Sequence, residues 1–454
     1  MELDKYYEDP VLIAQKLIQF NTTNVSEKEI KDTKEEPCTL FIKALFDNLN
    51  VENELIYSRR EGSEGRPNLL VKIKGEGNGV IPPLLLYGHL DVVSTEGQEW
   101  EEDPFGGVIK DGYLWGRGAI DMKGEHAIFL GAIFKIIKEG IKLPYDIYYL
   151  AVSDEEASGD YGMKALIEER PEIFEDIKYA FGEIGGFSLY MLDKKFYPIQ
   201  IAEKQVTRMR ITARGEAGHA SMKVNDSAVE KLSKAINLLS TKSMPVRVTK
   251  PVELMINGLA KGIGGIKGMI LKQLLIPSRT DFILKKLGKA GELFYPLLHN
   301  SINITILGGG TAINVVPSSV WFEADMRIVP ECTIEEAIED IKRIIGDDFE
   351  IEIKMYDEGG NQPDMKLYEG LAKTIKKHDE DAIPIPFVLA AVTDGRFLQK
   401  LGVQSYGYTP VRFPKDYSFA TLSHNANERV PIDAISFGTE TLYDYLLNQY
   451  EREF

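Results

Sequence analysis

Histidine and carboxylate side chains recur in this sequence directly behind short apolar runs. They are His89, Asp91, Asp154, Glu155, Glu156 and Glu183; Asp121 is expected at the same rim, between a glycine-rich approach and the start of a helix. A buried strand delivers such residues to the rim of a sheet, where open α/β folds keep their sites. Several carboxylates at one rim repel one another unless a cation lies between them. Imidazole and carboxylate ligands without thiolate suit zinc, with cobalt or manganese as substitutes, so the pattern predicts a divalent-metal site.

Each of these elements also has an ordinary structural explanation. A lone His-x-Asp, such as His89 with Asp91 in GHLDVV, is typical of a capped or surface pair. A run such as Asp154-Glu155-Glu156 is typical of a solvated helix start, where acidic groups favour the helix dipole. The repetition of these residues after successive apolar runs is what favours a site.

The segments that position these residues alternate between strand and helix patterns over the first 200 residues. Strands are expected at 69–73, 84–87, 147–152 and 179–181, and helices at 11–20 and 122–139. In the second helix, Ile128, Ala132, Ile133, Ile136 and Ile137 recur at helical spacing. Strand, crossover helix and strand in succession predict a mainly parallel sheet.

The pattern changes near residue 204. A β-α-β-β-α-β order predicts a ferredoxin-like α+β unit, with elements expected at 207–213, 226–239, 301–307, 320–327, 333–345 and 349–355. A helical insertion is expected at about 241–300. Its stretch KGIGGIKG, at 261–268, favours a flexible hairpin over a phosphate loop, because no strand-to-helix context surrounds it. The expected architecture is a catalytic α/β domain of residues 1–203 and 357–454, with a lid or dimerisation domain of residues 204–356 inserted.

Composition narrows the class of protein. With 454 residues the chain exceeds the size of one core, so about two domains are expected. The formal net charge of −17 argues against nucleic-acid and membrane partners, because both are polyanionic. Cys38 and Cys332 are the only cysteines, which fits a reducing compartment. The N-terminus has no signal-type apolar core, so a cytoplasmic protein is expected.

A set of ordered motifs gives these residues a family resemblance. The motifs, between residues 88 and 428, are GHLDVV, GRGAIDMKG, SDEEASG, EAGHAS, NVVP with a following DMR, TDGRF and SHNANE. Their order resembles that of the dinuclear zinc metallopeptidase superfamily that includes acetylornithine deacetylase, succinyl-diaminopimelate desuccinylase, aminoacylase-1 and glutamate carboxypeptidase. The insertion is similar to that of the longer carboxypeptidase and dipeptidase members.

The resemblance implies two divalent metal ions per chain. By position, His89 would bind one metal ion, His424 the other, and Asp121 would bridge both. Glu156 would complete the site of His424, and Glu183 that of His89. The family often has an aspartate at the position of Glu183, which is a departure from its pattern.

Further residues would act around the metal ions. Asp91 would hydrogen-bond the His89 ring and fix its tautomer. Glu155 is expected to be the general base, taking a proton from water and passing it to the leaving nitrogen. His219 is by default a structural histidine, but the resemblance implies that it stabilises the oxyanion in the partner subunit's site. That role requires a homodimer through the inserted domain, or a closure between domains.

Two residues of the inserted domain are candidates for substrate binding, Asn314 on a loop and Arg327 on a strand. Arg327 suits a bidentate grip on a substrate α-carboxylate, although a surface ion pair is the alternative. Asp394 and Arg396 in TDGRF are either structural or part of the pocket. The histidines outside every motif are expected to be surface or packing residues: His126, His299 and His378.

The function expected is metal-dependent hydrolysis of an amide next to a free carboxylate, in an N-acyl amino acid, a dipeptide or a C-terminal residue. An acetylornithine deacetylase or succinyl-diaminopimelate desuccinylase is the alternative, although their compact types lack the insertion. A catalytically dead metal-binding relative is the non-enzymatic alternative, but Glu155 and Asp121 are both present. Nucleotide binding is set aside, because no G-x-G-x-x-G opens a helix behind a strand.

Overall fold

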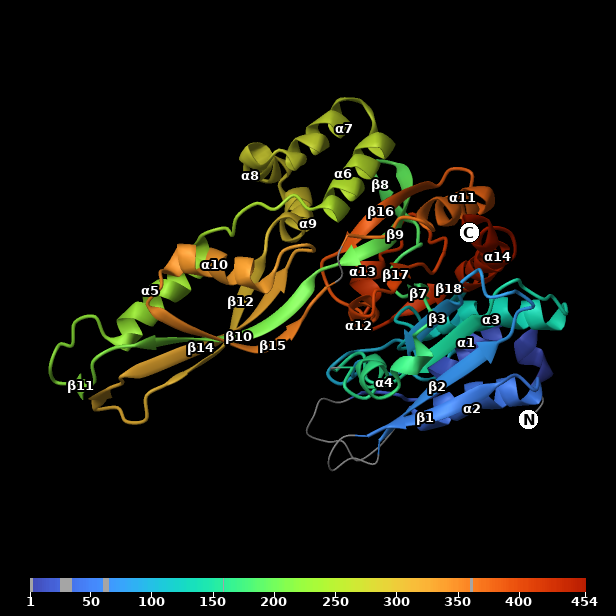
Figure 1. Ribbon diagram of the computed structural model, residues 1–454, viewed down its shortest axis with the longest axis horizontal. Helices are drawn as coiled ribbons and strands as arrows, with labels where there is room; N and C mark the ends of the chain where they lie inside the picture. Colours follow the sequence, from blue (N-terminus) through green and yellow to red (C-terminus); the bar gives the residue numbers. More distant parts are fainter. Residues whose placement is uncertain (1–2, 25–34, 60–64, 158, 360–361) are drawn as a thin grey trace. The chain divides into compact units, whose positions relative to one another are not determined.

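The computed structural model describes residues 3–24, 35–59, 65–157, 159–359 and 362–454 (Figure 1). Ser158, in the SDEEASG motif, lies outside the described residues. The chain divides into two compact units. Unit 1 comprises Met1–Ile201, Pro363–Phe387 and Thr393–Phe454, and unit 2 comprises Ala202–Gln362 and Val388–Val392.

A large mixed sheet forms the centre of unit 1. Its strand order is β1-β2-β6-β3-β7-β17-β9-β16, with β8 beside β9. The strands are β1 (Asn53–Ser58), β2 (Arg66–Ile73), β3 (Leu84–His89), β6 (Ile147–Val152), β7 (Tyr179–Gly182), β8 (Leu189–Met191), β9 (Lys194–Glu203), β16 (Ile383–Leu389) and β17 (Gln404–Gly407). The four central strands, β6, β3, β7 and β17, run parallel. The predicted α/β fold class with a mainly parallel sheet is confirmed.

Helices cover both faces of this sheet, which explains why β3, β6 and β7 are buried at every position. All six residues of β3 are buried. Because strand side chains alternate between faces, Leu85 and Tyr87 pack in one cluster with residues of α4 (Met163–Glu169) and α12 (Gly395–Lys400). Leu84 and Leu86 therefore point to the opposite face.

On that opposite face lies the crossover helix α3 (Lys123–Lys138). It packs against β3, α1 (Pro10–Ile18) and α14 (Ile432–Asn448). Further elements of this unit are α2 (Glu36–Asn48), α11 (Tyr368–His378), α13 (Phe419–Leu422) and a small sheet of β18 (Arg429–Pro431), β5 (Tyr113–Trp115) and β4 (Val108–Lys110).

Unit 2 contains the expected β-α-β-β-α-β chain order. Its four-stranded antiparallel sheet has the order β12-β14-β10-β15. The elements are β10 (Gln205–Arg214), α5 (Ala228–Thr241), β12 (Ser301–Gly309), β14 (Ser319–Ile328), α10 (Ile334–Ile345) and β15 (Phe349–Asp357). Burial alternates strictly along β14, so one face of the sheet packs on α5 and α10. A capping box of Thr333 and Glu336 starts α10.

Four α-helices lie between α5 and β12: α6 (Lys250–Ile263), α7 (Gly265–Lys272), α8 (Pro277–Leu287) and α9 (Lys289–Leu298). The glycine-rich stretch forms the break between α6 and α7, where Gly264 and Gly265 have positive φ angles of 70° and 56°. It connects helix to helix, so it is not a phosphate loop. A short ladder pairs β11 (Gly218–His219) with β13 (Val315–Val316). Within the described part of the chain, no helix is both long and apolar enough to cross a bilayer.

Candidate metal centre

The carboxyl ends of the parallel strands in unit 1 bring the predicted ligands to one edge of the sheet. His89 ends β3, Glu155 and Glu156 follow β6, and Glu183 follows β7. Since β3 lies between β6 and β7, these side chains meet although up to 94 positions separate them in sequence. Asp121 reaches the same edge from the loop before α3.

The carboxylate of Asp121 lies between two imidazole rings. Its Oδ1 is 3.1 Å from His89 Nε2, and its Oδ2 is 3.1 Å from His424 Nε2. Glu156 Oε1 lies 3.3 Å from His424 Nε2, and Glu183 Oε2 lies 3.6 Å from His89 Nε2. The groups thus form two sets that share Asp121, the division that the resemblance implies.

The charges of this cluster fit a bound cation. Burial raises the pKa of Glu156 to about 7 and that of Glu155 well above its usual range. Glu156 Oε1 is buried and accepts no hydrogen bond from the described residues. Atoms of His89, Asp121 and Glu156 lie within 4.8 Å of one another, as do atoms of His89, Glu155 and Glu183. Closely spaced nitrogen and oxygen donors of this kind suit a divalent metal ion.

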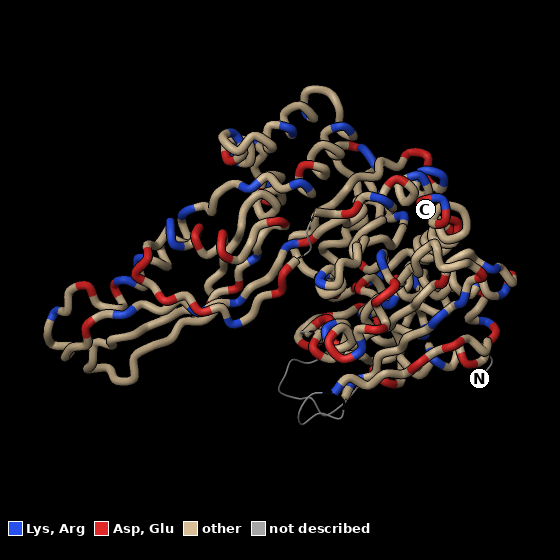
Figure 2. Tube along the Cα trace, viewed as in Figure 1, with Lys and Arg blue, Asp and Glu red and all other residues tan. Residues whose placement is uncertain are grey.

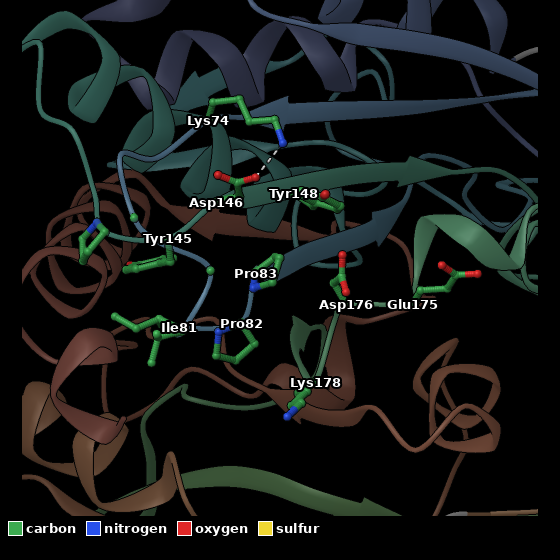
Figure 3. A pocket seen from close by; sticks show the side chains of 14 residues that line it. Lys74, Ile81, Pro82, Pro83, Tyr145, Asp146, Tyr148, Glu175, Asp176 and Lys178 are labelled. Carbon is green, nitrogen blue, oxygen red and sulfur yellow. Dashed lines mark hydrogen bonds and ion pairs between the residues drawn. The ribbon is translucent and has the colours of Figure 1, made fainter.

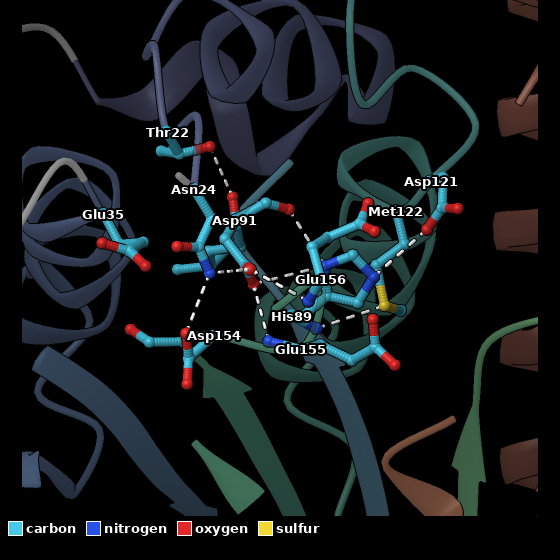
Figure 4. Close-up of polar contacts among 12 residues, drawn as sticks. Thr22, Asn24, Glu35, His89, Asp91, Asp121, Met122, Asp154, Glu155 and Glu156 are labelled. Atoms are coloured by element: carbon cyan, nitrogen blue, oxygen red, sulfur yellow. Dashed lines mark hydrogen bonds and ion pairs between the residues drawn. The ribbon is translucent and has the colours of Figure 1, made fainter. Parts of the chain in front are cut away.

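Asp91 connects the His89 ring to the loop after β6 (Figure 4). The ring Nδ1 lies 3.0 Å from the backbone oxygen of Asp91 and 3.5 Å from its carboxylate Oδ1. The carboxylate itself accepts the backbone N–H groups of Glu155 and Glu156, each at 3.1 Å. Nδ1 therefore carries a proton, and Nε2, which faces Asp121, is the ring nitrogen available to a metal ion.

A buried network that the sequence did not indicate holds Asp91 in place (Figure 4). Asn24 Nδ2 donates to Asp91 Oδ2 at 2.8 Å and to Asp154 Oδ1 at 2.9 Å. Arg66 Nη1 donates to the same Asp154 oxygen at 2.9 Å and to Glu35 Oε1 at 3.0 Å. Asn24 and Arg66 belong to no motif, so no local signal could have found them.

A second network holds the loop of Asp121. Glu428 Oε1 accepts the backbone N–H of Asp121 at 3.3 Å and that of the residue before it at 2.8 Å. Its Oε2 accepts Arg117 Nη1 at 2.7 Å, in an ion pair with almost no exposure. Glu428 closes the SHNANE motif and Arg117 lies in GRGAIDMKG, so these motifs carried a signal for both.

Gln98 extends this second network to the other histidine. Arg117 Nη2 donates to Gln98 Oε1 at 2.7 Å, and Gln98 Nε2 donates to the backbone oxygen of His424 at 2.9 Å. The His424 side chain is 51% exposed, so little packing holds it. Besides the contacts of its Nε2 with Asp121 and Glu156, the position of this ring therefore depends on the hydrogen bond that Gln98 donates to its backbone.

The TDGRF motif also lies at this edge. Arg396 Nη1 is 3.9 Å from Glu155 Oε1, and both residues have little exposure. Asp394 is buried, its oxygens accept no hydrogen bond from the described residues, and burial raises its pKa to about 7. The pair left open by the sequence therefore lies beside the predicted general base.

The three site residues predicted in unit 2 lie at two ends of its sheet. His219 pairs with Val315 in the β11–β13 ladder, and Asn314 accepts a backbone hydrogen bond of 3.0 Å from the residue after His219. Arg327 lies at the far end of β14, eight residues from its start, or about 26 Å of extended chain. It forms an ion pair of 2.7 Å with Asp325. His219 and Asn314 are brought together, whereas Arg327 is not with them.

The histidines outside the motifs have packing roles. His126 is buried, with Nε2 at 2.9 Å from the backbone oxygen of His89. His299 lies 3.0 Å from Asp281, and His378 lies 3.0 Å from Asp444.

A separate pocket of about 600 Å³ lies at the opposite edge of the sheet (Figure 3). It includes residues just before β3, β6 and β7, among them Pro83, Asp146 and Lys178. Lys74 and Asp146 form an ion pair of 2.7 Å there. Sites in open α/β sheets lie at the carboxyl edge, so this pocket is not the candidate centre.

Comparison with known proteins agrees with this geometry. Residues 85–448 match the model of peptidase family M20/M25/M40. The chain is 27% identical to aminoacylase-1 of Mus musculus over 384 residues, covering 82% of this chain and 80% of that protein. It is 25% identical to the N-fatty-acyl-amino acid synthase/hydrolase of Bos taurus over 450 residues, covering 95% of this chain and 86% of that protein.

Among solved structures, an M20 family metallo-carboxypeptidase from Sulfolobus solfataricus has the same fold. Its TM-score is 0.64 at 19% identity, with 97% of this chain and 99% of that chain covered. The resemblance inferred from the motifs is confirmed, and the protein is a hydrolase of a metal-dependent family. The chain belongs to peptidase family M20/M25/M40.

Proposed function

We propose that this protein is a dizinc amidohydrolase that cleaves an amide bond next to a free carboxylate. The observation that carries the proposal is the carboxylate of Asp121, with the Nε2 of a different histidine 3.1 Å from each oxygen. Glu155, whose side chain is 13% exposed, lies at the same edge within 4.8 Å of His89 and Glu183, and we assign it to proton transfer rather than to either set that shares Asp121. The substrate is an N-acyl amino acid, a dipeptide or a peptide with a free C-terminus.

The names of the relatives favour N-acyl amino acids among these substrates. Aminoacylase-1 and the N-fatty-acyl-amino acid synthase/hydrolase are both named for an acylated amino acid. A deacetylase of acetylornithine or a desuccinylase of succinyl-diaminopimelate is the second candidate within the same chemistry.

The metal ions would be held by His89, Glu183, Asp121, Glu156 and His424. When bound, they supply positive charge that polarises the substrate carbonyl and lowers the pKa of water. Glu155 takes the proton of the attacking water and delivers it to the leaving nitrogen, a contribution of about 10² to 10⁴ in rate. Asp91 supports this role, because it holds the backbone N–H of Glu155.

We assign His219 to the site of a partner subunit in a homodimer formed through unit 2. Ser221 donates its backbone N–H to His219 Nδ1 at 3.2 Å, so in the neutral ring the proton lies on Nε2. An exposed ring with this tautomer can donate to a developing oxyanion. Asn314, beside it, and Arg327 are assigned to the substrate, with Arg327 exchanging its Asp325 partner for a substrate carboxylate.

The compartment proposed is the cytoplasm. Cys38 and Cys332 are both buried and not disulfide-bonded. A chain that keeps its cysteines reduced fits a reducing compartment.

The test is metal content together with hydrolysis of N-acetyl, N-succinyl, longer N-acyl and dipeptide substrates. Wild type is compared with Glu155→Gln, and with Glu175→Gln as a control at the opposite edge of the sheet. We expect about two metal ions in all three proteins. Turnover should be lost only in Glu155→Gln, by about 10²-fold or more.

The preferred substrate then names the subclass. Wild type that binds metal but cleaves no substrate would support the non-catalytic relative. Wild type that binds no metal would overturn the ligand set.

A further inference from the structure

Helix α7 presents an apolar face away from the protein. Ile266, Met269 and Ile270 lie at i, i+3 and i+4, so they share one face, and they are 72%, 60% and 42% exposed. The opposite face, with Gly268 and Leu271, is buried. A Cβ built on Gly268 would lie only 2.3 Å from the backbone oxygen of Ala260, so α7 packs directly on α6.

Two lysines lie on either side of this apolar face. At 100° per residue, Lys267 lies on one flank and Lys272 on the other, between the apolar face and the buried face. Both are exposed. A helix that lies in a membrane interface has this arrangement, with apolar side chains entering the bilayer and lysines at the level of the headgroups.

Helix α8 repeats the arrangement. Phe282 is 63% exposed and lies opposite the buried Thr280 and Leu284. Lys285 and Lys286, at i+3 and i+4, adjoin it, and the Lys286 Nζ lies 5.6 Å from the ring centroid. Leu293 in α9 is 72% exposed as well.

The charge of this segment is opposite to that of the whole chain. Residues 261–292 carry seven lysines and arginines but only two acidic residues, whereas the chain has a net charge of −17. Figure 2 shows blue segments predominating over α7 and α8. The basic segment therefore retains attraction for an anionic surface although the protein as a whole is acidic.

We propose that α7 and α8 dock this protein on the surface of an anionic lipid bilayer. Exposed apolar side chains flanked by lysines match the two layers of such a surface, acyl chains below phosphate headgroups. A second copy of this chain fits less well, because a two-fold contact through this face would set the same cations against one another. The net charge of the whole chain argued against a membrane partner, but it does not show that this one segment is basic.

The experiment is cosedimentation of the metal-loaded enzyme with vesicles of phosphatidylcholine, with or without about a third phosphatidylglycerol. We expect binding to the anionic vesicles only, weakening as salt is raised. The affinity of the variant Ile266→Ser/Met269→Ser/Ile270→Ser for these vesicles should fall by about ten-fold or more, because three apolar side chains no longer enter the bilayer. In Lys285→Glu/Lys286→Glu the affinity for anionic vesicles should fall by at least about five-fold for each lysine removed, because each lysine near the surface contributes about 1 kcal/mol.

Matched controls use equally exposed positions elsewhere. Val80→Ser/Leu192→Ser/Ile313→Ser removes three apolar side chains that are 72%, 52% and 103% exposed, and should bind as wild type does. Because all these positions are on the surface, the variants should fold normally.

Three outcomes overturn the proposal. The first is absence of binding to anionic vesicles, and the second is binding that the α7 variant and the control variant reduce equally. The third is an α7 variant with a smaller mass than wild type in analytical ultracentrifugation, which would identify the face as a subunit interface. These experiments measure vesicle binding and mass, not hydrolysis, so their results can be interpreted even if the proposed function is wrong.

Discussion

Gln98→Glu separates the hydrogen bond that holds His424 from the rest of its network. The carboxylate keeps the acceptor for Arg117 Nη2 at 2.7 Å, but it has no N–H for the His424 backbone oxygen at 2.9 Å. A carboxylate oxygen of the variant then faces the backbone oxygen of His424, and the two repel each other. His424 and Asn427 both have positive φ angles, 61° and 63°, so this loop has reason to relax when the bond is lost.

The expected changes in stability and in metal affinity follow from the loss of one hydrogen bond outside the ligand set. Its net contribution to folding is about 1 kcal/mol, so the metal-free protein should lose no more than that in free energy of unfolding. Loss of an outer partner weakens metal binding by about 10- to 100-fold. We expect the lower end, about ten-fold, or about 1.4 kcal/mol, since the ring still faces Asp121 and Glu156.

The assay is calorimetric titration of the metal-free protein with zinc. Wild type should show two binding events, and in Gln98→Glu only the event of the His424 set should weaken. The matched control is Gln15→Glu, because Gln15 Nε2 donates a similar bond of 2.8 Å to the backbone oxygen of Gly107, in α1 and away from the site. If both events weaken equally, or if Gln15→Glu has the same effect, the assignment of Gln98 as a positioning residue is refuted.

Three further outcomes are expected. Arg66→Met leaves Asp154 and Glu35 buried without their cation and should lower the free energy of unfolding by about 3–5 kcal/mol in urea denaturation; a loss below about 1 kcal/mol would contradict the buried network. Removal of metal by a chelator should lower the melting temperature and zinc should restore it, since ligand at 1,000 times its Kd contributes about 4 kcal/mol; unchanged melting would count against the ligand set. Mixing inactive His219→Ala with inactive Glu155→Gln should recover about a quarter of wild-type activity, because half of randomly re-formed dimers contain one intact site; no recovery would exclude action across subunits.

Local pattern was sufficient for most of the secondary structure. The expected runs at 84–87 and 147–152 became β3 and β6, and the expected helix at 122–139 became α3, because apolar periodicity records which faces are buried. The six elements of unit 2 followed for the same reason. Motif order was sufficient for the family, which the comparison confirmed.

The whole-chain composition was a weaker guide to partners. A net charge of −17 averages over the chain and does not show that residues 261–292 are basic. Exposure of Ile266, Met269 and Phe282 was equally invisible, because an apolar side chain in a helical pattern is expected to be buried.

The sequence by itself determined which residues could carry the chemistry, because His89, Asp121, Glu155 and His424 lie in short motifs that are read locally. Tertiary structure decided how they are held. Gln98 contacts the backbone of a residue 326 positions away, and Arg66 contacts one 88 positions away. Such bonds depend on where the sheet places distant loops, and no local periodicity or spacing encodes that geometry.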